Sequence, residues 1–197
     1  EIGSEIKGYK IGDEIVCAVV CHPADEADWD KVPGLGYNGG YAEFAIVEDI
    51  NIVRIPPGVS FAHAAVATDA VATAYHAVVT EGPVGPGKTI AVVGLGGLGL
   101  SAVRIAVLKG VDLDSEKFAL ARNIGATESA SSLSAFKDVQ FDIIFDFAGA
   151  GVTTSDAALA VRPDGKVVLV GLAAKETTLN ALDIVMRRIT VKGSMGS

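Results

Sequence analysis

The sequence predicts an α/β protein in which a doubly wound parallel sheet follows a smaller β-rich segment. The first observation is the run Thr89–Leu100, T-I-A-V-V-G-L-G-G-L-G-L, where an apolar β-branched strand passes into a glycine-rich turn and a helix. The second is the alternation of strand and helix patterns beyond this run, which favours right-handed crossovers between parallel strands. The third is the different pattern of residues 1–58, where short strands lie between glycine-rich turns.

Composition narrows the possible functions. The 197 residues allow one or two domains, half of them are hydrophobic, and the net charge is -8. Because no basic stripe is present to neutralise phosphates, a nucleic-acid partner is not expected. No apolar run is long enough to cross a bilayer, and we expect no signal peptide. Two cysteines, Cys17 and Cys21, are too few for a disulfide framework, so a cytoplasmic, reduced setting is expected.

The order of patterns predicts three segments. Residues 1–58 form the β-rich part, residues 59–88 a connecting helical segment, and residues 89–197 the nucleotide-binding domain. Ser60 is suited to cap an alanine-rich helix that reaches Val79, and Asp69 interrupts this helix and could begin a second one. In the first segment we expect strands at Ile15–Val20, Tyr41–Val47 and Asn51–Ile55.

The nucleotide-binding segment alternates between the two kinds of element. After the strand Thr89–Val93 we expect helices at Leu100–Lys109, Ser115–Asn123 and Thr154–Val161, and strands at Phe141–Phe147, Lys166–Val170 and Ile189–Lys192.

The glycine run has the spacing G-x-G-x-x-G that binds a dinucleotide in a Rossmann fold. Gly94 permits the tight turn, Gly96 lets a pyrophosphate approach the backbone, and Gly99 lets the helix pack on the strand. Gly97 and Leu98 complete the motif at the positive end of the helix dipole, where free N–H groups would face the phosphates.

The acidic residue that usually binds the ribose lies about 20 positions beyond the glycine run, and Asp112 is the candidate. If the helix and its turn extend to Gly110, only Val111 is left to form the second strand. We therefore expect several residues to be missing between Gly110 and Val111.

Several further motifs resemble those of the zinc-containing medium-chain alcohol dehydrogenases. They are G-Y-K-I-G-D-E-I, P-G-L-G-Y-N-G-G-Y-A-E-F, I-P-P-G-V-S, D-A-V-A-T-A-Y-H-A, V-D-L-D-S-E-K-F-A-L-A, F-D-F-A-G and D-G-K-V-V-L-V-G-L, and with the glycine run they extend over nearly the whole chain. The resemblance implies a GroES-like catalytic domain before a Rossmann domain, with the active site in the cleft between them. It also implies that the family's other zinc ligands precede Glu1 and that the Rossmann domain is incomplete at its end.

The resemblance places Asp69 where the family has its third protein ligand to the catalytic zinc. A carboxylate is a proper zinc ligand, and an open fourth position would take water or the substrate oxygen. The alternative is that Asp69 caps a helix. The family's structural zinc is held by four clustered cysteines, and the pair Cys17 and Cys21 does not reproduce that cluster.

The resemblance also assigns cofactor contacts. Asp112 would accept hydrogen bonds from the adenosine ribose, which favours NAD over NADP because a 2′-phosphate would face like charge. Lys117 would contact the same ribose, although for both residues a solvated surface charge is the alternative. Seven residues would line the nicotinamide end: Thr73, Leu98, Phe147, Ala148, Val170, Gly171 and Leu172. For the apolar ones among them, packing in the core is the alternative role.

The implied function is a zinc- and NAD-dependent alcohol dehydrogenase that acts on a small alcohol, aldehyde or ketone as a homodimer or homotetramer. One alternative is a zinc-independent, NADPH-dependent quinone or enone reductase. Such an enzyme would usually have an alanine-rich version of the glycine motif and no acid at Asp112. Another alternative is a non-catalytic nucleotide-binding protein, since a fold does not fix a function.

Overall fold

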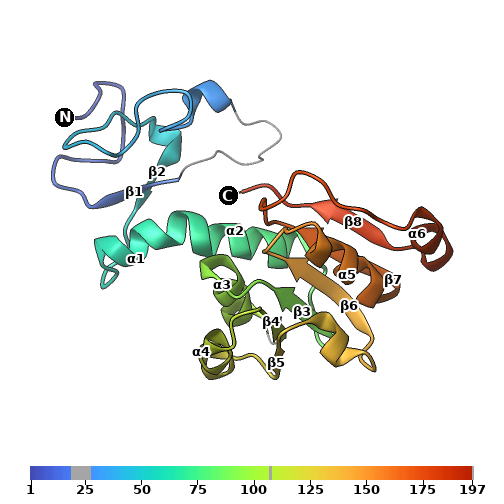
Figure 1. Ribbon diagram of the computed structural model, residues 1–197. Helices are drawn as coiled ribbons and strands as arrows, with labels where there is room; N and C mark the ends of the chain where they lie inside the picture. The colour runs from blue at the N-terminus through green and yellow to red at the C-terminus, as the bar shows by residue number, and fades with distance from the viewer. Residues whose placement is uncertain (19–27, 107, 197) are drawn as a thin grey trace. The chain divides into compact units, whose positions relative to one another are not determined.

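The computed structural model describes residues 1–18, 28–106 and 108–196 (Figure 1). The chain forms two compact units, Glu1–Ala72 and Thr73–Met195. The division between them falls inside the predicted connecting segment 59–88, and the three predicted domain boundaries stay a prediction. Among the described residues, no helix is long and apolar enough to cross a membrane.

The second unit is built on a six-stranded sheet in the order β5-β4-β3-β6-β7-β8, and every pair of neighbours is parallel. The prediction of a doubly wound parallel sheet is therefore confirmed. The order reverses at β3, so the chain leaves β3 and its neighbour β6 in opposite directions, which is where such sheets bind ligands. The strands are β3 (Ile90–Val93), β4 (Lys109–Val111), β5 (Ser129–Ala130), β6 (Phe141–Asp146), β7 (Val161–Leu169) and β8 (Thr190–Gly193).

Both faces of this sheet are buried at its centre. In β3 the side chains of Ile90 and Val92 join one core cluster, while Ala91 and Val93 join another. This alternation follows from the two-residue period of a strand, and it explains why the whole run is apolar. The helical elements of the unit are α2 (Ala72–Tyr75), η5 (His76–Glu81), α3 (Gly97–Ile105), α4 (Glu116–Ile124), η6 (Leu133–Phe136), α5 (Val152–Ala160) and α6 (Ala181–Arg187).

The path between α3 and β4 differs from the expectation. Helix α3 ends at Ile105, and Ala106 is already extended with φ -138° and ψ 143°. Gly110 and Val111 are consecutive residues of β4 and pair with Val92 and Val93. The early end of α3 leaves Lys109 and Gly110 to the strand, and the expectation that residues are missing between Gly110 and Val111 stays a prediction.

The first unit contains one antiparallel pair within its described residues, β1 (Ile15–Cys17) with β2 (Ile52–Arg54). Ser60 caps α1 as predicted, since its hydroxyl accepts a hydrogen bond from the backbone N–H of His63 at 3.3 Å. The remaining elements are η2 (Trp29–Lys31), η3 (Asp49–Asn51), α1 (Phe61–Val66) and η4 (Ala67–Val71).

The predicted strand Tyr41–Val47 was wrong, because this segment is irregular. Its large side chains, Tyr41, Phe44 and Ile46, are all exposed. Among the residues that the structure describes, this segment pairs with no strand and contributes no side chain to the core clusters, whereas a stable strand needs a partner and a buried face. The end of the predicted strand Ile15–Val20 lies outside the described residues, as does Cys21.

Candidate nucleotide-binding site

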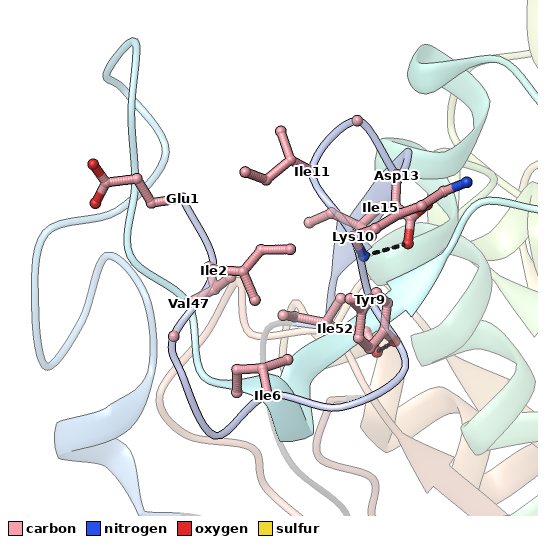
Figure 2. A pocket seen from close by; sticks show the side chains of 12 residues that line it. Glu1, Ile2, Ile6, Tyr9, Lys10, Ile11, Asp13, Ile15, Val47 and Ile52 are labelled. Carbon is pink, nitrogen blue, oxygen red and sulfur yellow. Dashed lines mark hydrogen bonds between the residues drawn. The ribbon is translucent and has the colours of Figure 1, made fainter.

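The first unit contains a hollow that differs in character from a nucleotide site. Its volume is about 260 Å³, and Figure 2 shows the side chains of Ile2, Ile6 and Ile11 around it. At its edge the Tyr9 hydroxyl donates to the carbonyl oxygen of Ile52 at 3.0 Å. A lining rich in isoleucine suits apolar groups rather than phosphates, so the nucleotide site has to be sought in the second unit.

The glycine turn after β3 is shaped by two close backbone contacts. Gly94 has φ +90°, and a Cβ there would lie 2.9 Å from the backbone nitrogen of Ala148. A Cβ on Gly99 would lie 1.8 Å from the carbonyl oxygen of Gly94. Both glycines are therefore required by the fold, which brings α3 and the loop after β6 against the turn.

Gly96 is different, because the fold does not require a glycine there. A Cβ on Gly96 would meet nothing within 4 Å, and its φ of -78° is accessible to any residue. Gly96 is the N-cap of α3 but has no side chain to satisfy the first N–H groups of the helix. Gly96 and Gly97 are both exposed. The arrangement leaves an uncapped helix start with open space beside it, which suits a phosphate.

Asp112 lies beside this turn, directly after β4. One of its carboxylate oxygens, Oδ2, accepts a hydrogen bond from the backbone N–H of Leu95 at 2.7 Å, and the other, Oδ1, accepts one from Asp114 at 2.9 Å. The Nζ of Lys117 lies 3.2 Å from both oxygens. The structure thus brings together the predicted acid, the predicted lysine and the glycine turn.

These contacts also set the charge of the site. Partial burial raises the pKa of the Asp112 carboxyl, but the N–H groups of Asp114 and Leu95 and the ammonium group of Lys117 outweigh it. The net result is a pKa below the ordinary value of 3.8. The side chain therefore carries a negative charge at neutral pH beside the glycine turn.

The predicted nicotinamide residues fall into two groups. Thr73, Phe147 and Val170 are buried, and the last two belong to the core cluster on one face of the sheet. The remaining positions, Leu98, Ala148, Gly171 and Leu172, are at least partly exposed, and Leu98 packs against the same core cluster. Core packing is thus a role that Leu98, Phe147 and Val170 already have, and their contact with a cofactor stays a prediction.

The sequence reasoning missed Asp146, the last residue of β6. Its carboxylate is fully buried and accepts hydrogen bonds from the hydroxyls of Thr153 and Thr154. A signal was present, because an acidic residue at the end of an apolar strand, followed at seven and eight residues by threonines, suggests a buried hydrogen-bonded carboxylate.

Asp69 lies in the first unit, where it is exposed. It is the third residue of the π-helical segment η4, whose N-cap is Val66. The alternative that Asp69 caps a helix was therefore wrong. Among the residues that the structure describes, no three His, Cys, Asp or Glu side chains are grouped so that they could hold a metal ion. Cys17 is half-buried, and the other cysteine lies outside the described residues.

Comparison with known proteins shows the family of this chain. A family model described as zinc-binding dehydrogenase matches residues 93–197, which is more than half of the chain. The chain belongs to this family. The matched region begins at the last residue of β3 and contains the glycine turn, Asp112 and the loops after β6 and β7.

Individual relatives agree with the zinc-binding dehydrogenase assignment. The chain is 26% identical to L-threonine 3-dehydrogenase of Paraburkholderia phymatum, over all of this chain and 64% of that protein. Among solved structures, acetophenone reductase of Geotrichum candidum in complex with NAD is 30% identical with a TM-score of 0.85, over 95% of this chain and 60% of the other. The alcohol dehydrogenase of Aeropyrum pernix, 23% identical over 99% of this chain and 64% of its own, has the same fold with a TM-score of 0.85.

The chain spans about two thirds or less of the length of these relatives. The match to threonine dehydrogenase extends over 221 residues, whereas this chain has 197. Within the matched region, the relative therefore has residues that have no counterpart here.

Proposed function

We propose that this protein is an oxidoreductase that transfers a hydride between NAD and a primary or secondary alcohol, or the corresponding aldehyde or ketone. The observation that carries the proposal is the Asp112 carboxylate, which is fixed beside the glycine turn by its hydrogen bond from Leu95. A dinucleotide on the turn would place its pyrophosphate at the start of α3 and its adenosine ribose at Asp112.

The charge at Asp112 supports NAD rather than NADP. A carboxylate accepts hydrogen bonds from both ribose hydroxyls, whereas the 2′-phosphate of NADP would be repelled by it. Lys117 is paired with Asp112 at 3.2 Å, so its positive charge is already partly neutralised. This pairing reduces the attraction that Lys117 would offer a 2′-phosphate.

In this proposal the loops after β6 and β7 hold the nicotinamide ring. Phe147 and Ala148 follow β6, and Val170, Gly171 and Leu172 follow β7. A Cβ on Gly94 would lie 3.2 Å from the Cβ of Ala148, so the loop after β6 lies directly against the turn that would hold the phosphates. The backbone of both loops would orient the ring for hydride transfer, and their apolar side chains would exclude water.

We also propose that Asp69 is a ligand of a catalytic zinc ion. An exposed carboxylate in a π-helical segment is suited to this role, because such segments occur frequently at functional sites. When bound, zinc would polarise the substrate oxygen as a Lewis acid. The family's description as zinc-binding supports the proposal, and the further ligands would come from outside the described residues of this chain.

The protein's self-association is a further part of the proposal. Strand β8 is at the edge of the sheet, and α6 next to it in the chain exposes Leu182, Val185 and Met186 at helical spacing. An exposed apolar helix face favours a homodimer or homotetramer. Val185→Glu should shift the mass measured by light scattering towards the monomer, whereas Asp156→Lys on α5 should not. An unchanged oligomer in the Val185→Glu variant would count against this surface.

We place the protein in the cytoplasm. The small number of cysteines is typical of a reducing compartment. Fractionation of cells that express the full-length protein, followed by detection in the soluble cytoplasmic fraction, tests this assignment.

The enzymatic proposal is tested by assaying the full-length protein with NAD and a panel of primary and secondary alcohols, together with zinc quantitation. Reduction of NAD with about one zinc per active site is the expected result. Reduction of quinones or enones by NADPH without metal would support the zinc-independent reductase. Nucleotide binding without turnover of any substrate would support the non-catalytic alternative.

A further inference from the structure

We propose that Asp146 is a positioning residue that fixes the two loops expected to hold the nicotinamide ring. This inference rests on the proposed function of the glycine turn and goes beyond it by assigning a role to a residue that does not itself face the cofactor. The role follows from a network of hydrogen bonds that joins β6, β7 and α5 at one point.

The carboxylate of Asp146 is fully buried and accepts four hydrogen bonds. Oδ1 accepts from the backbone N–H groups of Ala148 at 3.1 Å and Gly149 at 2.9 Å. Oδ2 accepts from the hydroxyl groups of Thr153 at 2.9 Å and Thr154 at 2.7 Å. A carboxylate suits four donors because, when ionised, it has acceptors only. The loop after β6 is therefore closed onto the first turn of α5.

The backbone of Asp146 extends the network to the next loop. Its carbonyl oxygen accepts from the N–H groups of Val170 at 2.9 Å and Gly171 at 3.0 Å, directly after β7. One residue thus holds the loop after β6 through its side chain and the loop after β7 through its main chain.

The two loops are also packed against each other with no room for side chains. A Cβ on Gly149 would lie 2.0 Å from the carbonyl oxygen of Gly171, and a Cβ on Gly171 would lie 2.4 Å from the carbonyl carbon of Ala148. Because the backbones touch, a shift of the first loop has to move the second. Asp146 therefore determines the position of both at once.

This geometry has a consequence for binding. The loops carry five predicted nicotinamide residues, whereas Gly96 and Asp112 at the adenosine and phosphate end do not take part in the network. Loosening the network should impair binding of the nicotinamide half and leave binding of the adenosine half nearly intact. A residue that only stabilised the fold would affect both halves equally.

The test compares NADH with ADP-ribose, which has the adenosine and pyrophosphate but lacks the nicotinamide. Asp146→Asn has nearly the same shape, but its amide NH₂ would replace one acceptor and face donors. We expect the Kd for NADH to rise about tenfold in this variant, because a buried network of four hydrogen bonds loses an acceptor. The Kd for ADP-ribose should rise less than the Kd for NADH, because neither Gly96 nor Asp112 makes a hydrogen bond to the network.

Asp142→Asn is the matched control, because Asp142 lies in the same strand near its opposite end and bonds to Arg162 and Lys88. It should change stability without changing the ratio of the two Kd values. If Asp146→Asn does not fold, two variants of Thr154 replace it. Thr154→Val removes one hydrogen-bond donor, so the ratio of the Kd for NADH to the Kd for ADP-ribose should rise. Thr154→Ser keeps the donor, so the ratio should stay at the wild-type value.

The outcomes are distinct. An unchanged ratio in the folded Asp146→Asn and Thr154→Val variants would overturn the positioning role, and so would an equal loss of affinity for both ligands. If the wild-type protein bound neither NADH nor ADP-ribose, the proposed nucleotide site itself would fail. Binding of both by the wild type, with a variant effect confined to NADH, supports the inference.

Discussion

The backbone N–H of Leu95 donates a 2.7 Å hydrogen bond to the carboxylate of Asp112, and this bond joins the glycine turn after β3 to the end of β4. The two residues are 17 positions apart in the sequence. Their contact places a negative charge beside an uncapped helix start, which is the combination that distinguishes a dinucleotide site from an ordinary glycine-rich turn.

The glycines of the turn should respond differently to substitution. Gly96→Ala adds a methyl group that meets no protein atom, so we expect a change in unfolding free energy of less than about 0.5 kcal/mol. The same methyl group would occupy the space beside the start of α3, so NADH binding should weaken about tenfold or more. Calorimetric titration and urea unfolding measure the two effects.

Gly99→Ala should show the opposite balance. Its methyl group would lie 1.8 Å from the carbonyl oxygen of Gly94, so the variant should lose about 2 kcal/mol or more of unfolding free energy. Gly85→Ala is the control for Gly96→Ala. Its methyl group also meets nothing within 4 Å, but it lies in the loop before β3. If Gly96→Ala and Gly85→Ala bound NADH equally well, open space at Gly96 would have no role in binding.

Asp112→Ala should reduce the preference for NAD over NADP. Loss of the carboxylate removes the acceptor for the ribose hydroxyls, which should raise the Kd for NAD about tenfold. In the wild-type protein Lys117 pairs with Asp112 at 3.2 Å. Without the carboxylate, Lys117 becomes available to attract a 2′-phosphate. Asp114→Ala, two residues along the chain and exposed, is the control. An NAD preference that survives Asp112→Ala would remove Asp112 from the ribose site.

Asp69→Ala should reduce the zinc content of the full-length protein and its alcohol oxidation, while NADH binding stays within about twofold of wild type because the two sites use different residues. Elemental analysis beside a cofactor titration measures both. Glu43→Gln, another exposed acid of the first unit, should leave the zinc content unchanged. Full zinc occupancy in Asp69→Ala would end the ligand proposal.

Asp142 should make the stability of the fold sensitive to acid. Partial burial raises the pKa of the Asp142 carboxyl. The N–H of Thr89 and the side chains of Arg162 and Lys88 lower it by more, so that the pKa is below the ordinary value of 3.8. A carboxyl with a lowered pKa in the folded state stabilises the fold fully above its unfolded pKa. That contribution is lost as the pH falls through the lower folded value.

The measurement is urea unfolding at neutral pH and at successively lower pH. Asp142→Asn should be less stable than wild type by about 1 to 2 kcal/mol at pH 7, and this difference should shrink as the pH falls below 3.8. Asp138→Asn, an exposed neighbour, should follow the wild-type curve. A stability difference that stayed constant down to the lowest pH would contradict the assignment.

The parts of the fold that local sequence determines could be predicted well. Strand β3, the turn at Gly94 and the following helix are specified by adjacent residues, and Ser60 caps its helix as expected. The place of Asp112 next to the turn also followed from its spacing. In each case the pattern and the structure depend on the same short segment of chain.

The features that the sequence did not predict depend on contacts between residues far apart in the chain. Tyr41–Val47 has the alternation of a strand, but the pattern does not reveal that none of the described strands pairs with it. The end of α3 was placed too late, because the need of Lys109 and Gly110 to pair with β3 is a long-range contact. For Asp146 a local signal was present in Thr153 and Thr154, but its contact with the loop after β7 is long-range and has no signal in the sequence.

The central claim, that the glycine turn and Asp112 form an NAD site, is tested most directly by titrating NAD and NADP separately into the wild-type protein at the same ionic strength. The repulsion between Asp112 and a 2′-phosphate predicts that NAD binds at least about tenfold more tightly. Equal affinity for the two cofactors, or binding of neither, would contradict the claim.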